Sequence, residues 1–121
     1  MRIGCDLVSL DRLAPRLEQE DFTRRVFHPL ELEQCAARKD RLAALGARFA
    51  AKEALSKALG KGLLTSGIFP RDIWVRRTDN GCPVLELAPH VRQELSRLGY
   101  SQCEVSLSHD GDYAMATVLL H

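Results

Sequence analysis

The sequence predicts an α+β fold in which a long central helix packs with an antiparallel sheet. Ala, Leu and Lys dominate residues 48–59, and Gly60 follows where a helix would end. Alternating apolar residues near both ends of the chain predict strands, and Asn80-Gly81 and Asp110-Gly111 are typical of hairpin turns. A chain of 121 residues can bury one core, so we expect a single domain over residues 1–121.

The chain opens on a predicted strand at residues 2–8. Ile3 and Cys5 alternate with Gly4 and Asp6. Asp6 therefore lies on the opposite face from Ile3, beside a glycine that leaves space. A carboxylate in this position is either exposed near the strand end or a ligand for a hard cation, and the pattern alone allows both.

Two short helices are predicted between residues 10 and 27. Their apolar positions are Leu10, Leu13 and Leu17 in the first and Phe22, Val26 and Phe27 in the second. Pro15 falls in an early turn of the first helix or at a kink. Asp21 can cap the second helix, with Arg24 and Arg25 turned outward.

A third helix and the central helix follow. Pro29 suits the first turn of the third helix. The central helix is expected from roughly residue 41 to residue 59, with Asp40 as its N-cap. Gly46 inside it weakens this expectation, because glycine costs about 1 kcal/mol in a helix interior.

The second half of the chain is predicted to be mostly sheet. Residues 63–71 contain Ser66, Gly67 and Pro70 and are expected to form a loop. Strands are expected at residues 72–78, 84–87, 103–108 and 113–120, with a helix at 89–98 that begins at Pro89 and ends before Gly99. The last strand is apolar on both faces, so we expect it to be buried, with another subunit as one candidate cover.

The composition predicts a soluble globular protein of the cytoplasm. Hydrophobic residues make up 45% of the chain and charged residues 27%. No apolar run approaches membrane-spanning length, and the N-terminus lacks the pattern of a signal peptide. Cys5, Cys35, Cys82 and Cys103 show no zinc-ligand spacing, so we expect reduced thiols.

The charge is unevenly distributed along the chain. A net charge of +1 argues against general nucleic-acid binding. Residues 38–61 nevertheless hold seven of the 17 basic residues and only two of the 16 acidic ones. Such a segment predicts either a basic patch that attracts a multiply charged anion or an ordinary solvated helix face.

The central helix has one apolar and one polar side. The apolar side carries Ala51, Leu55, Ala58 and Leu59, and the polar side carries Phe49, Glu53, Ser56, Lys57 and Gly60. An acid, an amine and a hydroxyl beside a helix end suit an anionic ligand held through a metal ion. The alternative is a solvated Glu53–Lys57 pair, the commonest favourable spacing on helix surfaces.

Three segments together carry a resemblance to one known family. They are Gly-Cys-Asp-Leu-Val at 4–8, Arg-Phe-Ala-Ala-Lys-Glu-Ala-Leu-Ser-Lys-Ala-Leu-Gly at 48–60 and Val-Ser-Leu-Ser-His-Asp-Gly-Asp-Tyr-Ala at 105–114. Over nearly its whole length the chain resembles the 4′-phosphopantetheinyl transferases, of the small holo-[acyl-carrier-protein] synthase type. The central segment is the most specific of the three, and the opening Gly-x-Asp alone would be weak.

This resemblance implies a fold, a reaction and an assembly. The fold is that of the 4′-phosphopantetheinyl transferases, in a homotrimer with its sites at the subunit interfaces. The reaction moves the phosphopantetheine arm of coenzyme A to a serine of apo acyl carrier protein and releases adenosine 3′,5′-bisphosphate. Magnesium is the expected metal. Neither nucleic acid nor membrane is an expected partner.

The resemblance also assigns the reacting groups. Asp6 and Glu53 match the two metal-binding carboxylates of the family, a number typical of magnesium sites completed by phosphate oxygens and water. Lys57 matches a lysine near the diphosphate, where it could neutralise or protonate the leaving phosphate. Either Glu53 or a metal-bound water could take the serine proton, and the sequence does not choose between them.

The remaining matched positions are binding residues. Those expected to contact coenzyme A are Lys39, Arg48, Phe49, Ser56, Gly60, Pro83, Ser108 and His109, of which Ser108 and His109 reach it from a neighbouring subunit. Those expected to meet the acidic helix of the carrier protein are Arg12, Arg16, Arg24 and Arg25. Each position has a local alternative: His109 could flank a turn, and Arg16 and Arg24 could be solvated.

Two departures and two competing functions complete the prediction. His28-Pro29 replaces the small hydroxyl residue common in the family, and no acid stands two places after Asp6, which favours the small trimeric type. One alternative function is a non-catalytic module that binds coenzyme A or a carrier protein. The other is a metal-dependent phosphohydrolase.

Overall fold

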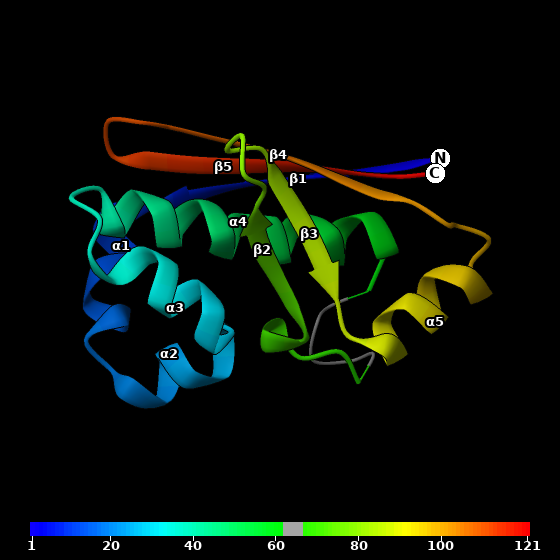
Figure 1. Cartoon of the computed structure of the whole chain (residues 1–121), viewed down its shortest axis with the longest axis horizontal. Coiled ribbons are helices and arrows are strands. Elements are labelled where there is room, and N and C mark those ends of the chain that lie inside the picture. The colour runs from blue at the N-terminus through cyan, green and yellow to red at the C-terminus, as the bar shows by residue number, and fades with distance from the viewer. Residues whose placement is uncertain (62–66) are drawn as a thin grey trace.

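Helix α4 (Arg41–Leu59) lies across one face of a three-stranded antiparallel sheet, and the rest of the chain is arranged around this contact (Figure 1). The computed structural model describes residues 1–61 and 67–121. Within the sheet, β5 (Tyr113–Leu120) is the central strand, with β1 (Arg2–Ser9) on one side and β4 (Cys103–Asp110) on the other. The first and last strands of the chain are therefore neighbours, and both termini lie at the same end.

Small residues allow the helix and the sheet to approach closely. Alternate residues of β1 and β5 face α4, and Gly4 lies directly against it. A Cβ at Gly4 would lie 1.9 Å from the Ala54 carbonyl oxygen, a distance that no side chain can adopt. Gly46 is likewise confined, since its Cβ would meet Leu10 at 2.5 Å. The glycine that weakened the helix prediction is thus a packing residue.

Three short helices cover the N-terminal end of α4 (Figure 1). They are α1 (Leu10–Leu17), α2 (Glu20–Val26) and α3 (Pro29–Ala36). Pro15 lies inside α1, and Pro29 is the first residue of α3. The prediction of Asp21 as a cap was wrong, because α2 begins at Glu20 and its N-cap is Gln19, two residues before Asp21.

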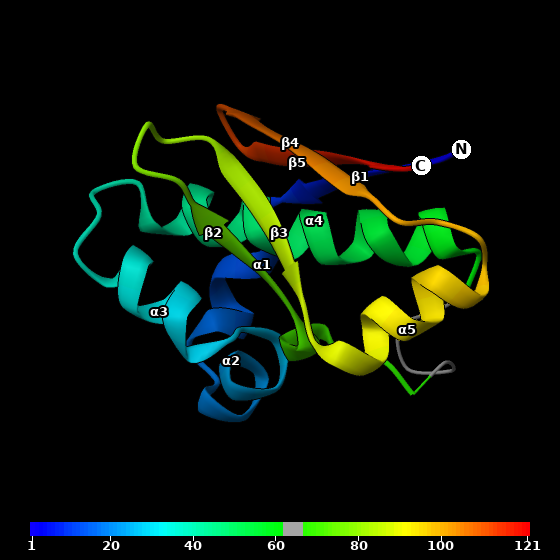
Figure 2. The same cartoon turned by 45° about the vertical axis from the view of Figure 1, so that its right-hand side comes forward.

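The predicted second-half strands form two sheets rather than one. A 3-10 turn, η2 (Pro70–Asp72), leads into a separate hairpin of β2 (Ile73–Arg77) and β3 (Pro83–Leu87), followed by α5 (Pro89–Arg97) (Figure 2). Ile73, Val75 and Leu85 bury this hairpin against the common core. Of the expected loop at 63–71, residues 63–66 lie outside the described residues, and its end forms η2.

The chain reversals differ in detail from those predicted. Gly60 ends α4 in the left-handed conformation with φ of 72°, as expected of a C-cap glycine. Asp40 precedes α4 but does not cap it through its side chain, which pairs with Arg38 at 2.8 Å instead. The β4–β5 turn is centred on Gly111-Asp112 rather than Asp110-Gly111, because Asp110 already pairs with Tyr113. Gly111 supplies the positive φ at the first turn position.

The second face of the three-stranded sheet is largely exposed in the part of the chain that the structure describes. Val118 and Leu120 are fully buried against α4, as predicted. Ile3 and Leu7, on the opposite face, are 69% and 64% exposed, and Tyr113 and Met115 lie beside them on β5. No helix in the described part of the chain is both long and apolar enough to span a membrane.

Candidate active site

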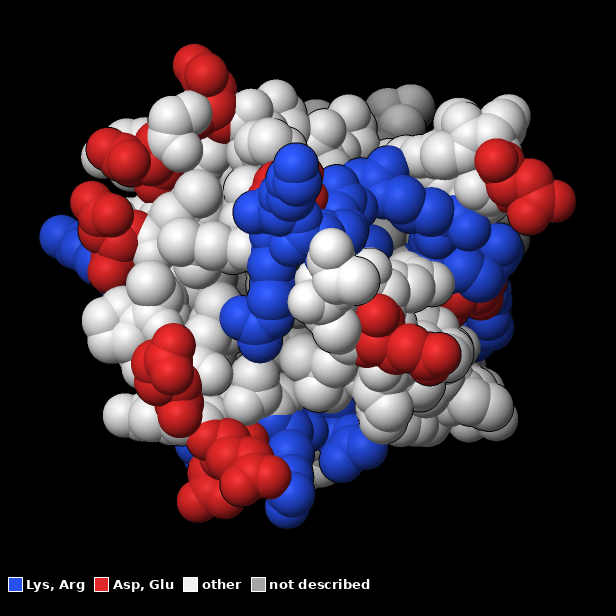
Figure 3. All heavy atoms as spheres, turned by 60° about the vertical axis from the view of Figure 1, so that its left-hand side comes forward, with Lys and Arg blue, Asp and Glu red and all other residues white. Residues whose placement is uncertain are grey.

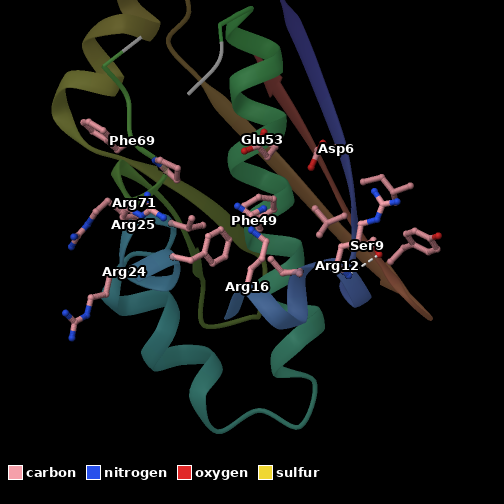
Figure 4. A pocket seen from close by; sticks show the side chains of 17 residues that line it. Asp6, Ser9, Arg12, Arg16, Arg24, Arg25, Phe49, Glu53, Phe69 and Arg71 are labelled. Carbon is pink, nitrogen blue, oxygen red and sulfur yellow. Dashed lines mark hydrogen bonds between the residues drawn. The ribbon is translucent and has the colours of Figure 1, made fainter. Parts of the chain in front are cut away.

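Asp6, Glu53 and Lys57 meet where β1 crosses the middle of α4. Lys57 Nζ donates to Asp6 Oδ1 at 2.9 Å and to the Cys5 carbonyl oxygen at 3.0 Å. Glu53 lies one helical turn before Lys57 and next to Asp6 (Figure 4). The close approach at Gly4 holds β1 in this position, so the packing of the fold determines the geometry of the three side chains.

The two carboxylates have different environments. Burial raises the pKa of Glu53, and the negative charge of Asp6 raises it further. The hydrogen bond from Lys57 to Asp6, together with the charge of that carboxylate, raises the pKa of the Lys57 ammonium. At neutral pH the site therefore holds a charged lysine, an aspartate paired with it and a glutamate of increased basicity.

A groove of about 1070 Å³ opens in front of the two carboxylates. Asp6 and Glu53 lie side by side at one end of it (Figure 4), and Phe22 and Phe49 are among the apolar residues that line it. Its arginines are Arg12 and Arg16 from α1, Arg24 and Arg25 from α2, and Arg71 from η2. Figure 3, which turns the α1–α3 end of the molecule forward, shows a band of Lys and Arg across this face.

Most of these arginines are not neutralised within the chain. Arg24 pairs with Glu20 at 2.5 Å, and the Arg16 guanidinium lies over the Phe22 ring, 4.2 Å from its centroid. Among residues 1–61 and 67–121, no ion pair involves Arg12, Arg16, Arg25 or Arg71. The groove therefore combines an apolar lining with a positive rim and suits an amphipathic, acidic partner.

Two residues of the expected basic patch are interior groups instead. Lys52 is 1% exposed and donates to Glu31 Oε1 at 2.6 Å, to the Pro70 carbonyl oxygen at 3.0 Å and to that of Ile73. Arg48 is also 1% exposed and donates to the Ala44 carbonyl oxygen at 3.2 Å. The prediction of an exposed basic patch over residues 38–61 is thus wrong for these two positions. Both side chains face inward, because α4 is covered on several sides.

The polar side of α4 is also narrower than predicted. Ser56 is 6% exposed, and its hydroxyl donates to the Lys61 carbonyl oxygen. Glu53 is half-buried, whereas Lys57 and Gly60 are exposed. Phe49 is half-buried with its ring 6.1 Å from that of Phe22, which explains an aromatic residue on this side.

Most of the expected coenzyme A residues do not line this groove. Phe49 lines it, and the following lie outside it: Lys39, Arg48, Ser56, Gly60, Pro83, Ser108 and His109. His109 Nε2 is 3.9 Å from Asp40 Oδ2, which places the β4–β5 hairpin beside the start of α4. Ser56 and Gly60 lie at the other end of this helix, near Lys57.

Sequence reasoning missed Phe69 and Arg71 as lining residues. They lie across the groove from Ser9 and Arg12 (Figure 4). They lie at the end of the predicted loop, and no periodic pattern in the sequence connects them with α1 or α2. The sequence signal was an aromatic residue two positions before an arginine, which is weak evidence in a loop.

Comparisons with known proteins agree on one family. The family model described as the 4′-phosphopantetheinyl transferase superfamily matches residues 2–118. The holo-[acyl-carrier-protein] synthase of Trichlorobacter lovleyi is 42% identical over 120 residues, which cover 98% of this chain and 94% of that protein. The enzyme of the same name from Syntrophus aciditrophicus is 43% identical and covers 97% of this chain and 92% of its own length.

Solved structures give the same result. The crystal structure of holo-[acyl-carrier-protein] synthase from Neisseria meningitidis superposes with a TM-score of 0.90 at 30% identity, covering 99% of this chain and 97% of that one. The Helicobacter pylori synthase, solved in complex with coenzyme A, gives a TM-score of 0.84 at 28% identity, with 98% and 99% of the two chains covered.

Proposed function

The chain belongs to the 4′-phosphopantetheinyl transferase superfamily, and from this premise we propose that it makes holo acyl carrier protein. It is an enzyme that transfers the 4′-phosphopantetheine group of coenzyme A to a serine of the apo carrier protein. The observation that carries this conclusion is the Asp6–Lys57 pair beside Glu53 at one end of an arginine-rimmed groove. A non-catalytic binding module would not need these three groups together.

The reaction is a displacement at phosphorus. The serine oxygen bonds to the phosphorus that bears the pantetheine arm, and the bond from that phosphorus to the bridging oxygen breaks. The serine proton goes to a base, and adenosine 3′,5′-bisphosphate leaves with the bridging oxygen. We assign Glu53 as that base, because it is half-buried beside Asp6 in the groove that the acceptor serine must enter.

Lys57 is proposed to stabilise the leaving phosphate. Its ammonium is fully charged at neutral pH, and Asp6 holds it at the edge of the site. A fixed positive charge near the bridging oxygen stabilises the negative charge that develops there. Asp6 therefore has two proposed roles, as a partner of Lys57 and as a ligand for a cation.

The carboxylate pair fits a magnesium ion. Asp6 and Glu53 offer hard oxygen donors from two elements to one space, and their mutual repulsion favours a cation between them. When bound, magnesium would offset the charge of the diphosphate and polarise the phosphorus. Two protein ligands leave its other positions to phosphate oxygens and water.

We propose that coenzyme A binds between subunits of a homotrimer. Phe49, Ser56 and Gly60 would come from the subunit that supplies the carboxylates, and Ser108 and His109 from the next subunit, together with Lys39, which adjoins the Asp40 that His109 contacts. This arrangement would bring the two groups together on one ligand. The exposed apolar face of the sheet, with Ile3, Leu7 and Met115, supports such an assembly.

The carrier protein is proposed to dock through the groove arginines. Arg12, Arg16, Arg24 and Arg25 are exposed along α1 and α2, where they can meet an acidic helix. We place the reaction in the cytoplasm, which agrees with four unpaired cysteines.

Release of adenosine 3′,5′-bisphosphate tests this function. We expect the chain to release it from coenzyme A in the presence of magnesium and apo carrier protein, one molecule for each holo carrier protein formed. Release that does not require the carrier protein would instead identify a phosphohydrolase. Carrier-protein binding without any release would identify a binding module.

A further inference from the structure

The groove has a second wall that the expected docking residues do not include. Phe69, Pro70 and Arg71 line the groove opposite Ser9 and Arg12 (Figure 4). Phe69 is 57% exposed, although it is a large aromatic side chain. Arg71 is exposed as well and forms no ion pair among residues 1–61 and 67–121.

Hydrogen bonds connect this wall to the rest of the fold on both sides. Lys52, buried in α4, donates to the Pro70 carbonyl oxygen at 3.0 Å while paired with Glu31. The Phe69 N–H donates to Asp72 Oδ2, and the Ala88 N–H donates to the Asp72 carbonyl oxygen, both at 2.9 Å. Glu53 directly follows Lys52 on α4. The hydrogen bond from Lys52 to Pro70 therefore connects the wall to the helix that carries one of the two reacting carboxylates.

The other exposed arginines show what distinguishes Arg71. Arg76 and Arg92 both lie near Glu86, and Arg97 pairs with Glu94. Arg2, Arg41 and Arg77 form no ion pair among the described residues, but they lie outside the groove. Within the same part of the chain, Arg71 is an unpaired arginine inside the groove, beside the exposed Phe69, and this combination is typical of a binding surface.

We infer that Phe69 and Arg71 form a second docking wall for the acyl carrier protein, with Arg71 contacting its acidic surface. This inference rests on the proposed function. The acceptor serine must reach Asp6 and Glu53, which line the same groove as both walls, so a partner that occupies the groove lies between the α1–α2 wall and the η2 wall. Arginines on both sides fit an acidic helix lying between them, and Phe69 covers its apolar residues.

Direct binding tests the inference without requiring transfer. The probe is an apo acyl carrier protein whose acceptor serine is replaced by alanine, measured against the immobilised chain by surface plasmon resonance. We expect Arg71→Glu to raise Kd about tenfold and Phe69→Ala to raise it about threefold. We also expect the affinity of Arg71→Glu to depend less steeply on salt than that of the wild type.

Matched controls separate docking from folding and from coenzyme A binding. Arg92→Glu makes the same charge change on α5, outside the groove, and should leave Kd within about twofold. Thermal unfolding should show that both variants are folded. In the transfer assay, Arg71→Glu should raise the KM for the carrier protein and leave the KM for coenzyme A unchanged.

Two results would overturn the inference. One is wild-type affinity in Arg71→Glu, and the other is an equal loss in Arg92→Glu. A rise in the KM for coenzyme A instead of the carrier protein would assign the wall to the nucleotide and would also overturn it. If the wild type binds the carrier protein, Arg71→Glu weakens that binding and no phosphopantetheine is transferred, the docking wall stands and the proposed reaction falls.

Discussion

For a single residue, replacement of Glu53 is expected to affect stability and activity differently. Its charged form is disfavoured in the folded chain by burial and by Asp6. Glu53→Gln removes that charge without changing shape, so the midpoint of thermal unfolding at pH 7.5 should stay equal or rise. The transfer rate should fall about 100-fold or more, because the proposed base is lost.

The exposed Glu33→Gln on α3 is the matched control, with wild-type rate and stability expected. Differential scanning fluorimetry and a steady-state transfer assay measure the two properties. A Glu53→Gln variant that keeps more than about a tenth of the wild-type rate would contradict its assignment as the base.

His28 gives the folded chain a predicted pH dependence. Its Nδ1 accepts a hydrogen bond from the Leu30 N–H at 3.1 Å and so caps α3, while the ring stacks on Trp74. Burial lowers the pKa of His28 below 6.5, so the unfolded chain takes up a proton first as the pH falls. This contribution to stability is complete above about pH 6.5 and declines below it.

His28→Asn keeps a helix-capping side chain but does not titrate. Between pH 7.5 and 5.0, the unfolding midpoint of the wild type should therefore fall more than that of His28→Asn. If the unfolding midpoints of the two proteins fall equally with pH, protonation of His28 does not cause the loss of stability.

At the scale of the element, the contact of β1 with α4 is the feature that positions the site. Gly4→Ala would force a Cβ to within 1.9 Å of the Ala54 carbonyl oxygen, so β1 must move away from the helix. We expect a loss of about 2 kcal/mol or more in the free energy of unfolding, measured with urea. Activity should fall as well, because Asp6 moves with the strand.

Cys5→Ala, on the exposed face of the same strand, should cost under about 0.5 kcal/mol and serves as the control. Wild-type stability and activity in Gly4→Ala would show that the close approach is not required.

Local patterns predicted the elements well and their partners poorly. Central helix α4, the proline-initiated α3 and α5, and the position of each strand followed from spacing and turn residues. A helix cap depends on which of several nearby polar residues takes the position and on what its side chain bonds. The Asp40 side chain bonds Arg38 instead of the start of α4, and Gln19 instead of Asp21 precedes α2. The division into two sheets depends on long-range packing, which no local pattern records.

The resemblance pointed to three residues that the structure places side by side. Asp6 lies beside Glu53 and Lys57, although it is 47 positions from Glu53 and 51 from Lys57 in sequence. The interior placement of Arg48 and Lys52 was not predictable from charge, because it depends on which elements cover α4. Arg71 was missed for the same reason, since folding alone brings η2 to the groove.

At the scale of the whole molecule, the proposed homotrimer predicts complementation between inactive chains. Lys39→Ala/His109→Ala would damage the proposed contribution to the next subunit, and Glu53→Gln would damage the carboxylate group. Co-expressed in equal amounts, the two variants should assemble some sites with both groups intact. Random assembly would restore about a quarter of the sites.

The transfer rate of the mixture, compared with each variant alone, measures this effect, and light scattering gives the mass of the assembly. The absence of any recovery in a mixed trimer would show that each site lies within one chain.

Transfer of phosphopantetheine by this chain can be measured by intact-mass spectrometry of an apo acyl carrier protein. The carrier protein is incubated with the chain, coenzyme A and magnesium. We predict a mass gain of one phosphopantetheine group that is lost when the metal is chelated or the acceptor serine is replaced by alanine. An unchanged mass with several carrier proteins and a folded chain would contradict the account.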